Sequence, residues 1–212
     1  MIIAVDGPTA SGKGTIARAI AAHFGVPYLD TGLLYRAVGR QVALDGGDPD
    51  NPLDALAACG FADALMDDPV LRSEEVGGLA SRVSVHPEVR KALFERQRAF
   101  AEQPGGAVLD GRDIGTVIAP DADVKLYITA SVQERARRRW LEMIEKGIGS
   151  EDEIPLAEIE RDIVARDARD MGRKDAPLRA APDALVIDTT SFDREAAYQV
   201  VLEAICEALG RS

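Results

Sequence analysis

Cysteine is scarce in this chain of 212 residues, which contains two. Cys59 and Cys206 stand in apolar stretches, with no histidine or second cysteine at metal-binding spacing. The sequence therefore predicts neither a disulfide framework nor a zinc site. Such cysteine usage is typical of a protein from a reducing compartment such as the cytoplasm.

Positive charge and long apolar runs are scarce as well. Lys and Arg total 25 against 36 Asp and Glu, a net charge of −11, which argues against the broad basic surface of a non-specific nucleic-acid binder. The apolar run at residues 2–5 is too short for the core of a signal peptide, and no later segment approaches a membrane span. We expect a cytoplasmic protein with neither a nucleic acid nor a membrane as partner.

The chain does contain a glycine-rich turn directly after that run, in MIIAVDGPTASGKGT. Gly7 and Gly12 lie five apart and Lys13 follows, a pattern that turns backbone N–H groups towards phosphate oxygens at the start of a helix. Lys13 would reach the outer phosphates of a nucleoside triphosphate, and the Thr15 hydroxyl would meet phosphate or Mg²⁺. The alternative is a fortuitous glycine turn.

One residue departs from the general phosphate-binding motif, which has Ser or Thr after the lysine. Here Gly14 takes that place, and GKGT points towards the small-molecule kinases among P-loop proteins. The predicted ATP-phosphate residues are Gly7, Pro8, Thr9, Ala10, Ser11, Gly12, Lys13, Gly14 and Thr15.

Strand and helix patterns alternate outside residues 47–103. Strands are predicted at 2–5, 26–30, 107–109, 122–130 and 183–190, and amphipathic helices follow them. Gly25 should end the first helix, Thr31 should cap the second, and Ser131 with Glu134 forms a capping box for the helix after residue 131. We predict an α/β, three-layer P-loop fold with a central, mostly parallel five-stranded sheet flanked by helices.

Residues 47–103 have helical periodicity and lack alternating strand runs. We expect helices at 50–68, 73–84 and 86–103, inserted into a core made of residues 1–46 and 104–212. By spacing alone, Ser81 and Arg90 are interpreted as solvated helix residues.

Chemistry-bearing residues follow two of the predicted strands. DGRD, residues 110–113, closes a buried strand, where Asp110 could position Mg²⁺ or its water and Arg112 could clamp a phosphate; a structural Asp-Gly turn is the alternative. Tyr35 and Arg36 begin the helix after another strand, either over the cleft or as core and solvated residues respectively.

Arginines crowd the last third of the chain. Arg135, Arg137, Arg138 and Arg139 stand near a helix start, where cations oppose the helix dipole, so we expect one or two of them to face phosphates unless the face is merely solvated. The polar segment at 147–154 suits a lid, assigned to about residues 138–156. Arg166, Arg169, Asp170 and Arg173 share one helix side, a pattern typical of surface ion pairs.

Taken together, GPTASGKGT, DTGLLYR, VRKALFERQRAF, LDGRDIGTVIAPDADVKLYITAS, RDARDMGR and DALVIDTT closely resemble the bacterial cytidylate kinase family over nearly the whole chain. The resemblance implies transfer of the γ-phosphoryl group of ATP to CMP or dCMP, with Mg²⁺. It assigns the CMP site to Thr31, Tyr35, Arg36, Ser81, Arg90, Arg112, Asp113, Arg166, Asp170 and Arg173. Lys13, Arg36, Arg112 and Arg173 are the predicted catalytic residues, and Asp110 or Thr15 would hold the metal through water.

Two features depart from the family pattern. Thr31 stands where members often have Ser, and the segment LMDDPVLRSEEVGGLA is too short for the β-rich part of the longer members, so we expect a reduced, mainly helical CMP-side lobe.

Two other functions stay open: another P-loop kinase acting on UMP, AMP or a metabolite, and a non-enzymatic NTP-dependent switch. No large apolar face stands out, which favours a monomer.

Overall fold

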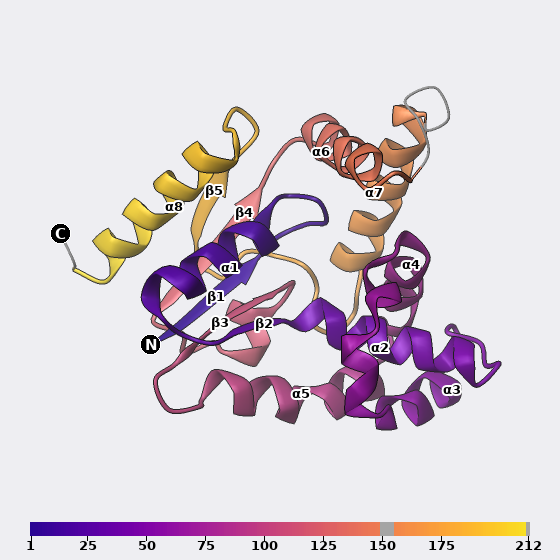
Figure 1. Cartoon of the computed structure of the whole chain (residues 1–212). Helices are drawn as coiled ribbons and strands as arrows, with labels where there is room; N and C mark the ends of the chain where they lie inside the picture. Colours follow the sequence, from indigo (N-terminus) through magenta and orange to yellow (C-terminus); the bar gives the residue numbers. More distant parts are fainter. Residues whose placement is uncertain (149–154, 211–212) are drawn as a thin grey trace.

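The computed structural model describes residues 1–148 and 155–210. Within them, five strands form one sheet in the order β2-β3-β1-β4-β5 (Figure 1), and every neighbouring pair is parallel. The strands are β1 (Ile2–Asp6), β2 (Tyr28–Asp30), β3 (Ala107–Gly111), β4 (Val124–Thr129) and β5 (Leu185–Asp188). The predicted five-stranded α/β sheet is confirmed, and it is parallel throughout.

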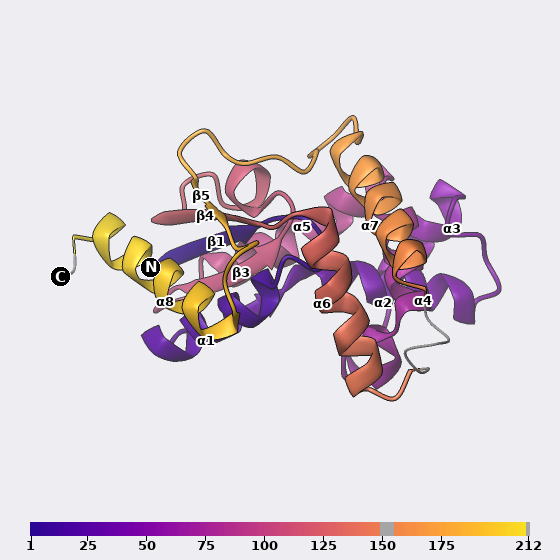
Figure 2. The ribbon, with the colours of Figure 1, turned by 90° about the horizontal axis from the view of Figure 1, so that it is seen from above.

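Helices cover both faces of this sheet. The α-helices of the described residues are α1 (Lys13–Phe24), α2 (Thr31–Leu44), α3 (Pro52–Ala57), α4 (Glu74–Val83), α5 (Pro87–Ala101), α6 (Val132–Glu145), α7 (Leu156–Met171) and α8 (Arg194–Ala208), of which α1 and α8 cover one face and α5 the other. In Figure 1, α1 and α8 lie together on one side of the sheet, and Figure 2 shows the same arrangement from above.

Alternation along β1 explains the three layers. Ile3 and Val5 point to one face and pack with α1 and α8 in one apolar cluster, whereas Ala4 joins a second cluster with α5 on the opposite face. All three side chains are fully buried. Because successive strand residues point to opposite faces, a central strand covered on both sides is apolar without a break.

Residues 45–106 contain helices and short 3₁₀ turns and no strand, as expected. The predicted helix at 50–68 is wrong, because α3 ends at Ala57 and 3₁₀ turns continue the chain. Phe61 turns to an extended ψ of 147° after Gly60, and its buried ring packs in the cluster of α2. Burial of this ring takes precedence over local helix propensity.

The predicted helix ends are correct in part. Gly25 ends α1 in the left-handed region, with φ 65°. Thr31 is not the cap of α2, since Asp30 holds that position and the Thr31 hydroxyl donates instead to the Asp110 carbonyl at 2.8 Å. Ser131 Oγ accepts from Glu134 N at 3.2 Å, but the Glu134 carboxylate completes no capping box, because it pairs with arginines.

Two further expectations concern the lid and the membrane. The predicted lid spans the end of α6 and the start of α7, and its residues 149–154 lie outside the described residues. In the described part of the chain, no helix has the length and apolarity to cross a bilayer.

Candidate active site

A cleft with a volume of about 860 Å³ opens at the carboxyl edge of the sheet. Residues of α2, α4, α6 and α7 and of the loop that precedes α1 line the cleft, and Figure 1 shows how these elements are arranged, with α6 above and α2 below. Of the predicted phosphate-binding loop, Thr9, Ala10, Ser11, Gly12, Lys13, Gly14 and Thr15 line the cleft, and Gly7 and Pro8 do not. All ten predicted CMP-site residues line it: Thr31, Tyr35, Arg36, Ser81, Arg90, Arg112, Asp113, Arg166, Asp170 and Arg173.

The phosphate-binding loop, residues 7–15, has the backbone that its glycines predict. Gly12 adopts φ 84° immediately before α1, and a Cβ on Gly7 would lie 2.0 Å from the Ile128 carbonyl oxygen. Ala10 also has a positive φ, 57°. Ser11 Oγ is buried without a hydrogen-bond partner among the described residues, so the loop presents an unused hydroxyl at the start of a helix, where an anion binds favourably.

Lys13 and Asp110 meet at the floor of the cleft. Lys13 Nζ lies 3.6 Å from Asp110 Oδ1, and the Tyr28 hydroxyl donates to Asp110 Oδ2 at 3.2 Å. Burial lowers the pKa of Lys13 to about 8, with Arg112 adding to the effect, and burial raises the pKa of Asp110. A desolvated ammonium of this kind gains from a phosphate oxygen that replaces its lost water.

A second group of charges faces the loop from β3 and α7. Arg112 Nε donates to Asp170 Oδ2 at 2.9 Å, and Arg173 pairs with the other oxygen of the same carboxylate. Burial alone would raise the pKa of Asp170, but Arg112, Arg173 and Arg166 outweigh it and hold that pKa below its ordinary value. Around Asp170, the positive charge of Arg112, Arg166 and Arg173 therefore exceeds the negative charge of the carboxylate.

Arg166 accounts for that excess. It forms no ion pair with the residues that the structure describes, and its Nε is buried without a partner. Burial lowers its pKa, and the neighbouring cations Arg112 and Arg36 lower it further. Because a guanidinium stays protonated in proteins, the buried positive charge of Arg166 has no carboxylate to balance it among the described residues.

The lower wall brings α2, α4 and α5 together. Arg36 donates to the carbonyls of Leu71 and Ser73, each at 2.7 Å, and Arg90 pairs with Asp113. The Arg90 guanidinium stands 5.5 Å from the centre of the Tyr35 ring. Tyr35 is thus both a core residue and part of the cleft wall.

The expectation from spacing that Ser81 and Arg90 are solvated helix residues is wrong. They are 2% and 8% exposed and are not solvated, because α4 and α5 turn these positions towards the cleft. The ladder of Arg166, Arg169, Asp170 and Arg173 is only in part a surface feature, since Asp170 is 1% exposed and Arg166 and Arg173 are half-buried, whereas Arg169 is exposed.

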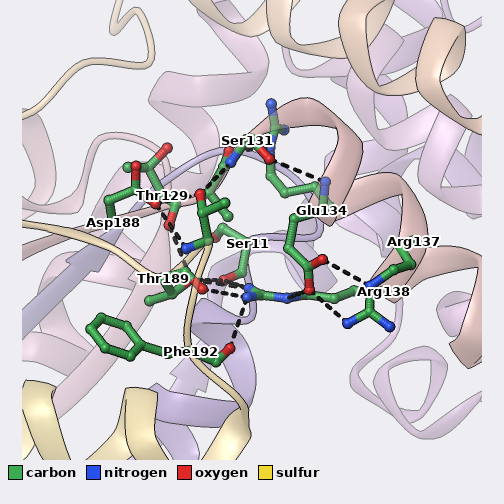
Figure 3. Close-up of polar contacts among 12 residues, drawn as sticks. Ser11, Thr129, Ser131, Glu134, Arg137, Arg138, Asp188, Thr189 and Phe192 are labelled. Carbon is green, nitrogen blue, oxygen red and sulfur yellow. Dashed lines mark hydrogen bonds and ion pairs between the residues drawn. The ribbon is translucent and has the colours of Figure 1, made fainter.

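The arginines of α6 are mostly held by the protein itself. Arg135 is buried, pairs with Asp167 at 2.6 Å and donates to the Thr9 carbonyl at 3.1 Å. Figure 3 shows Arg138 between Ser11, Thr189 and Phe192, where it donates to the Ser11 carbonyl at 3.3 Å and to Thr189 Oγ1 at 3.0 Å. The positive charges of the arginines near the start of α6 are therefore compensated largely by carboxylates and carbonyl groups of the protein.

Arg137 and Arg139 remain at the cleft surface. Arg137 pairs with Glu134 and is 57% exposed, whereas Arg139 pairs with Glu74 and Glu142. Arg139 Nε is buried and unpartnered within the described residues.

Sequence reasoning missed two candidate functional residues, Ser84 and Asp6. Ser84 lines the cleft at 4% exposure and accepts from Arg173 at 2.8 Å; its spacing of three from Ser81 on α4 is the signal that could have found it. Asp6 is 3% exposed at the end of β1, and a carboxylate that closes an apolar strand is its signal.

Oxygen donors suited to a hard cation are present. Asp110 offers a buried carboxylate and Thr15 a hydroxyl at the same end of the cleft. No cluster of three or more metal-ligating side chains occurs in residues 1–148 and 155–210. Both cysteines are free thiols.

Comparisons with known proteins agree with this geometry. Residues 3–209 match the sequence profile of the family described as cytidylate kinase. A protein named cytidylate kinase from Cereibacter sphaeroides is 57% identical over 203 residues, which cover 96% of this chain and 94% of that protein. Its namesake from Caulobacter vibrioides is 47% identical over 211 residues, 99% of this chain and 97% of that protein.

A solved structure, that of an uncharacterized protein from Eubacterium ventriosum, has a TM-score of 0.56 and 14% identity, and the match covers 97% of this chain and 98% of that chain. That likeness shows the shared fold alone. The profile match over nearly the whole length, together with identities far above chance, shows that this chain belongs to the cytidylate kinase family.

Proposed function

We propose that this protein transfers the γ-phosphoryl group of ATP to CMP and dCMP, and that its cleft is divided into a donor site and an acceptor site. The observation that carries the proposal is the unneutralised positive charge opposite the phosphate-binding loop. Arg166 has no carboxylate partner in the described chain, and Arg166 Nε and Arg173 Nε are buried without hydrogen bonds there. A phosphate monoester supplies the oxygens that these donors lack.

The donor site is formed by the phosphate-binding loop. Its backbone N–H groups and the N-terminus of α1 receive the β- and γ-phosphates, and the Lys13 ammonium bridges their oxygens. Ser11 Oγ, buried and unpartnered in the described chain, is a further donor to them. Of the α6 arginines, we assign Arg139 and Arg137 to the ATP phosphates, because Arg139 Nε is buried and unpartnered in the described chain and Arg137 is 57% exposed. Arg135 and Arg138, by contrast, already donate to backbone carbonyls of the loop.

The acceptor phosphate lies among the arginines of three elements. Arg36 from α2, Arg112 from the end of β3 and Arg173 after α7 converge on the cleft, and Arg166 adds the fourth guanidinium. Planar guanidinium groups bind phosphate through paired N–H donors. They hold the attacking phosphate oxygen towards the γ-phosphorus and neutralise the charge that spreads in the transition state.

The nucleoside lies deeper, against α4 and α5. Asp113 can accept from the exocyclic amine of cytosine, and Arg90 can donate to the acceptor edge of the base. Uracil presents the reverse pattern, so the Arg90–Asp113 pair favours cytosine. We place the remaining residues around sugar and base: Thr31, Tyr35, Ser81 and Asp170.

Mg²⁺ is the metal that this donor set fits. We propose that Asp110 or Thr15 would hold it through water, and the bound ion would supply positive charge to the phosphates of ATP. No activated side-chain nucleophile is needed, because the acceptor phosphate is already an anion. We further propose a cytoplasmic monomer with an acceptor lobe at residues 47–103, a lid at about 138–156 and no nucleic-acid partner.

The test is an assay with ATP and each of the nucleoside monophosphates, coupled to ADP formation. We expect CMP and dCMP to be preferred over UMP and AMP, and Asp113→Ala to reduce that preference for cytosine. A stronger response to UMP or AMP would favour another acceptor. ATP hydrolysis that ignores the acceptor, or ATP binding without turnover, would favour a nucleotide-dependent switch.

A further inference from the structure

Asp6 is a buried carboxylate that the phosphoryl-transfer chemistry does not use. It ends β1, is 3% exposed and lies outside the cleft lining. The backbone N–H groups of Ile114 and Gly115 donate to its two oxygens, Oδ1 and Oδ2, each at 2.8 Å. Both bonds bridge more than a hundred residues of sequence, so they connect two separate parts of the fold.

The two parts are the donor loop and the acceptor segment. On one side, Asp6 is bonded to Gly7, which is pressed against β4 so closely that a Cβ would lie 2.0 Å from the Ile128 oxygen. On the other side, Ile114 and Gly115 start a π-helical turn directly after Arg112 and Asp113. A shift of that turn would move both side chains relative to the donor loop.

We propose that Asp6 is a positioning residue that holds Arg112 and Asp113 in register with the phosphate-binding loop, so that donor and acceptor phosphates meet in line. The inference rests on the proposed function. Arg112 Nε donates to Asp170 at 2.9 Å and Asp113 pairs with Arg90. The contact of Asp6 with the turn after Asp113 therefore orients Arg112 in the first ion pair and Asp113 in the second.

The chemistry of the side chain supports a positioning role over a purely stabilising one. Burial, reinforced by Asp113 and Asp110, raises the pKa of Asp6 to about 7 despite its two backbone hydrogen bonds. The ionised group is therefore costly to keep in this place. Among the short side chains, only an ionised Asp offers two acceptors to two adjacent N–H groups, since Asn offers one acceptor and one donor.

Asp6→Asn tests this role, with Asp123→Asn as the matched control. Asp123 accepts from the Ile2 N–H at 2.7 Å at the opposite end of β1, away from the cleft. For Asp6→Asn we expect kcat/KM for CMP to fall about tenfold or more, as for a misplaced catalytic group, while the Kd for ATP changes less than about twofold. Asp123→Asn should leave both constants unchanged.

Thermal unfolding separates positioning from folding. Because Asn removes a costly buried charge, the melting temperature of Asp6→Asn should stay level or rise while activity falls. A fall in melting temperature with unchanged kinetics of the folded enzyme would overturn the proposal. So would equal losses in ATP and CMP binding, since these would indicate general collapse of the site.

Amide hydrogen exchange in the unmodified protein tests the contact without any variant. We expect the N–H groups of Ile114 and Gly115 to exchange as slowly as those of β3 and, in Asp6→Asn, to accelerate selectively. Rapid exchange in the unmodified protein would overturn the proposal. If the protein phosphorylates a monophosphate other than CMP, the proposed substrate fails but the kinetic test is run on that acceptor and still decides the role of Asp6.

Discussion

Gly14 shows how one residue can be dictated by a neighbour far away in the chain. A Cβ at this position would lie 2.8 Å from Asp110 Oδ2, a contact too short for any side chain. The general motif allows Ser or Thr there, but in this fold the carboxylate at the end of β3 takes the space. The glycine is therefore a packing requirement of the Lys13–Asp110 pair.

Gly14→Ser should displace Asp110. We expect kcat/KM to fall about tenfold and the free energy of unfolding to fall by about 1–3 kcal/mol, as for an overpacked buried site. Steady-state kinetics and chemical denaturation measure the two effects. Unchanged values for both would mean that Asp110 moves aside without cost.

Arg112 is the residue on which the phosphate clamp depends most directly. Arg112→Ala should lower kcat/KM by about 10²–10³, as loss of a charge-stabilising donor does, while the fold persists because Asp170 keeps Arg173 as partner. The measurement is the coupled assay together with circular dichroism. Arg161→Ala, a 75% exposed position on α7, is the control and should retain full activity; near-normal turnover of Arg112→Ala would contradict its role.

At the scale of the elements, α4 carries two adjacent glycines in different surroundings. A Cβ on Gly77 would lie 2.9 Å from an Arg36 guanidinium nitrogen, whereas a Cβ on Gly78 would meet open space. The same substitution at neighbouring positions therefore separates helix propensity from the acceptor site.

Gly78→Ala should stabilise the protein by about 0.5–1 kcal/mol, because alanine is the better helix former, and leave the kinetics unchanged. Gly77→Ala gains the same propensity but pushes Arg36 away from its place, so the KM for CMP should rise. Melting curves and CMP titrations compare the two variants. An equal KM in both would show that Arg36 adjusts freely.

Elements with a strong local pattern were predictable, and contacts between elements were not. The apolar run at residues 2–5 predicts β1, and Gly12 and Gly25 mark the ends of α1. All of these signals act locally. The break after Ala57 depends on where Phe61 is buried. The Arg135–Asp167 pair joins α6 to α7 and turns an unfavourable cluster of cations into a structural contact, which no spacing reveals.

At the scale of the whole molecule, the pH dependence of stability reports on Asp6. Burial raises its pKa from 3.8 to about 7 in the folded state, so between these values the folded protein holds a proton that the unfolded chain releases. This contribution to stability is present below the unfolded pKa and is lost as pH rises through the folded one.

The unfolding free energy of Asp6→Asn minus that of the unmodified protein should therefore increase between pH 3.8 and about pH 7, by at most about 1.4 kcal/mol per pH unit, and level off above that range. Chemical denaturation of both proteins across this range measures it. Other titrating groups, such as Asp110, are common to both proteins and largely cancel in the difference. A flat difference would show that the ionised carboxylate is fully compensated in the fold.

By itself the sequence determined the α/β class and the family, and it predicted the donor loop and the acceptor residues that we propose, because these depend on local glycines, apolar runs and short motifs. The tertiary structure decided which charges are left without partners. Arg135 and Arg138 are satisfied by the protein, and Arg166 has no ion-pair partner in the described chain. Ion pairing depends on distances across the fold, and so does the contact of Asp6 with the segment after Asp113.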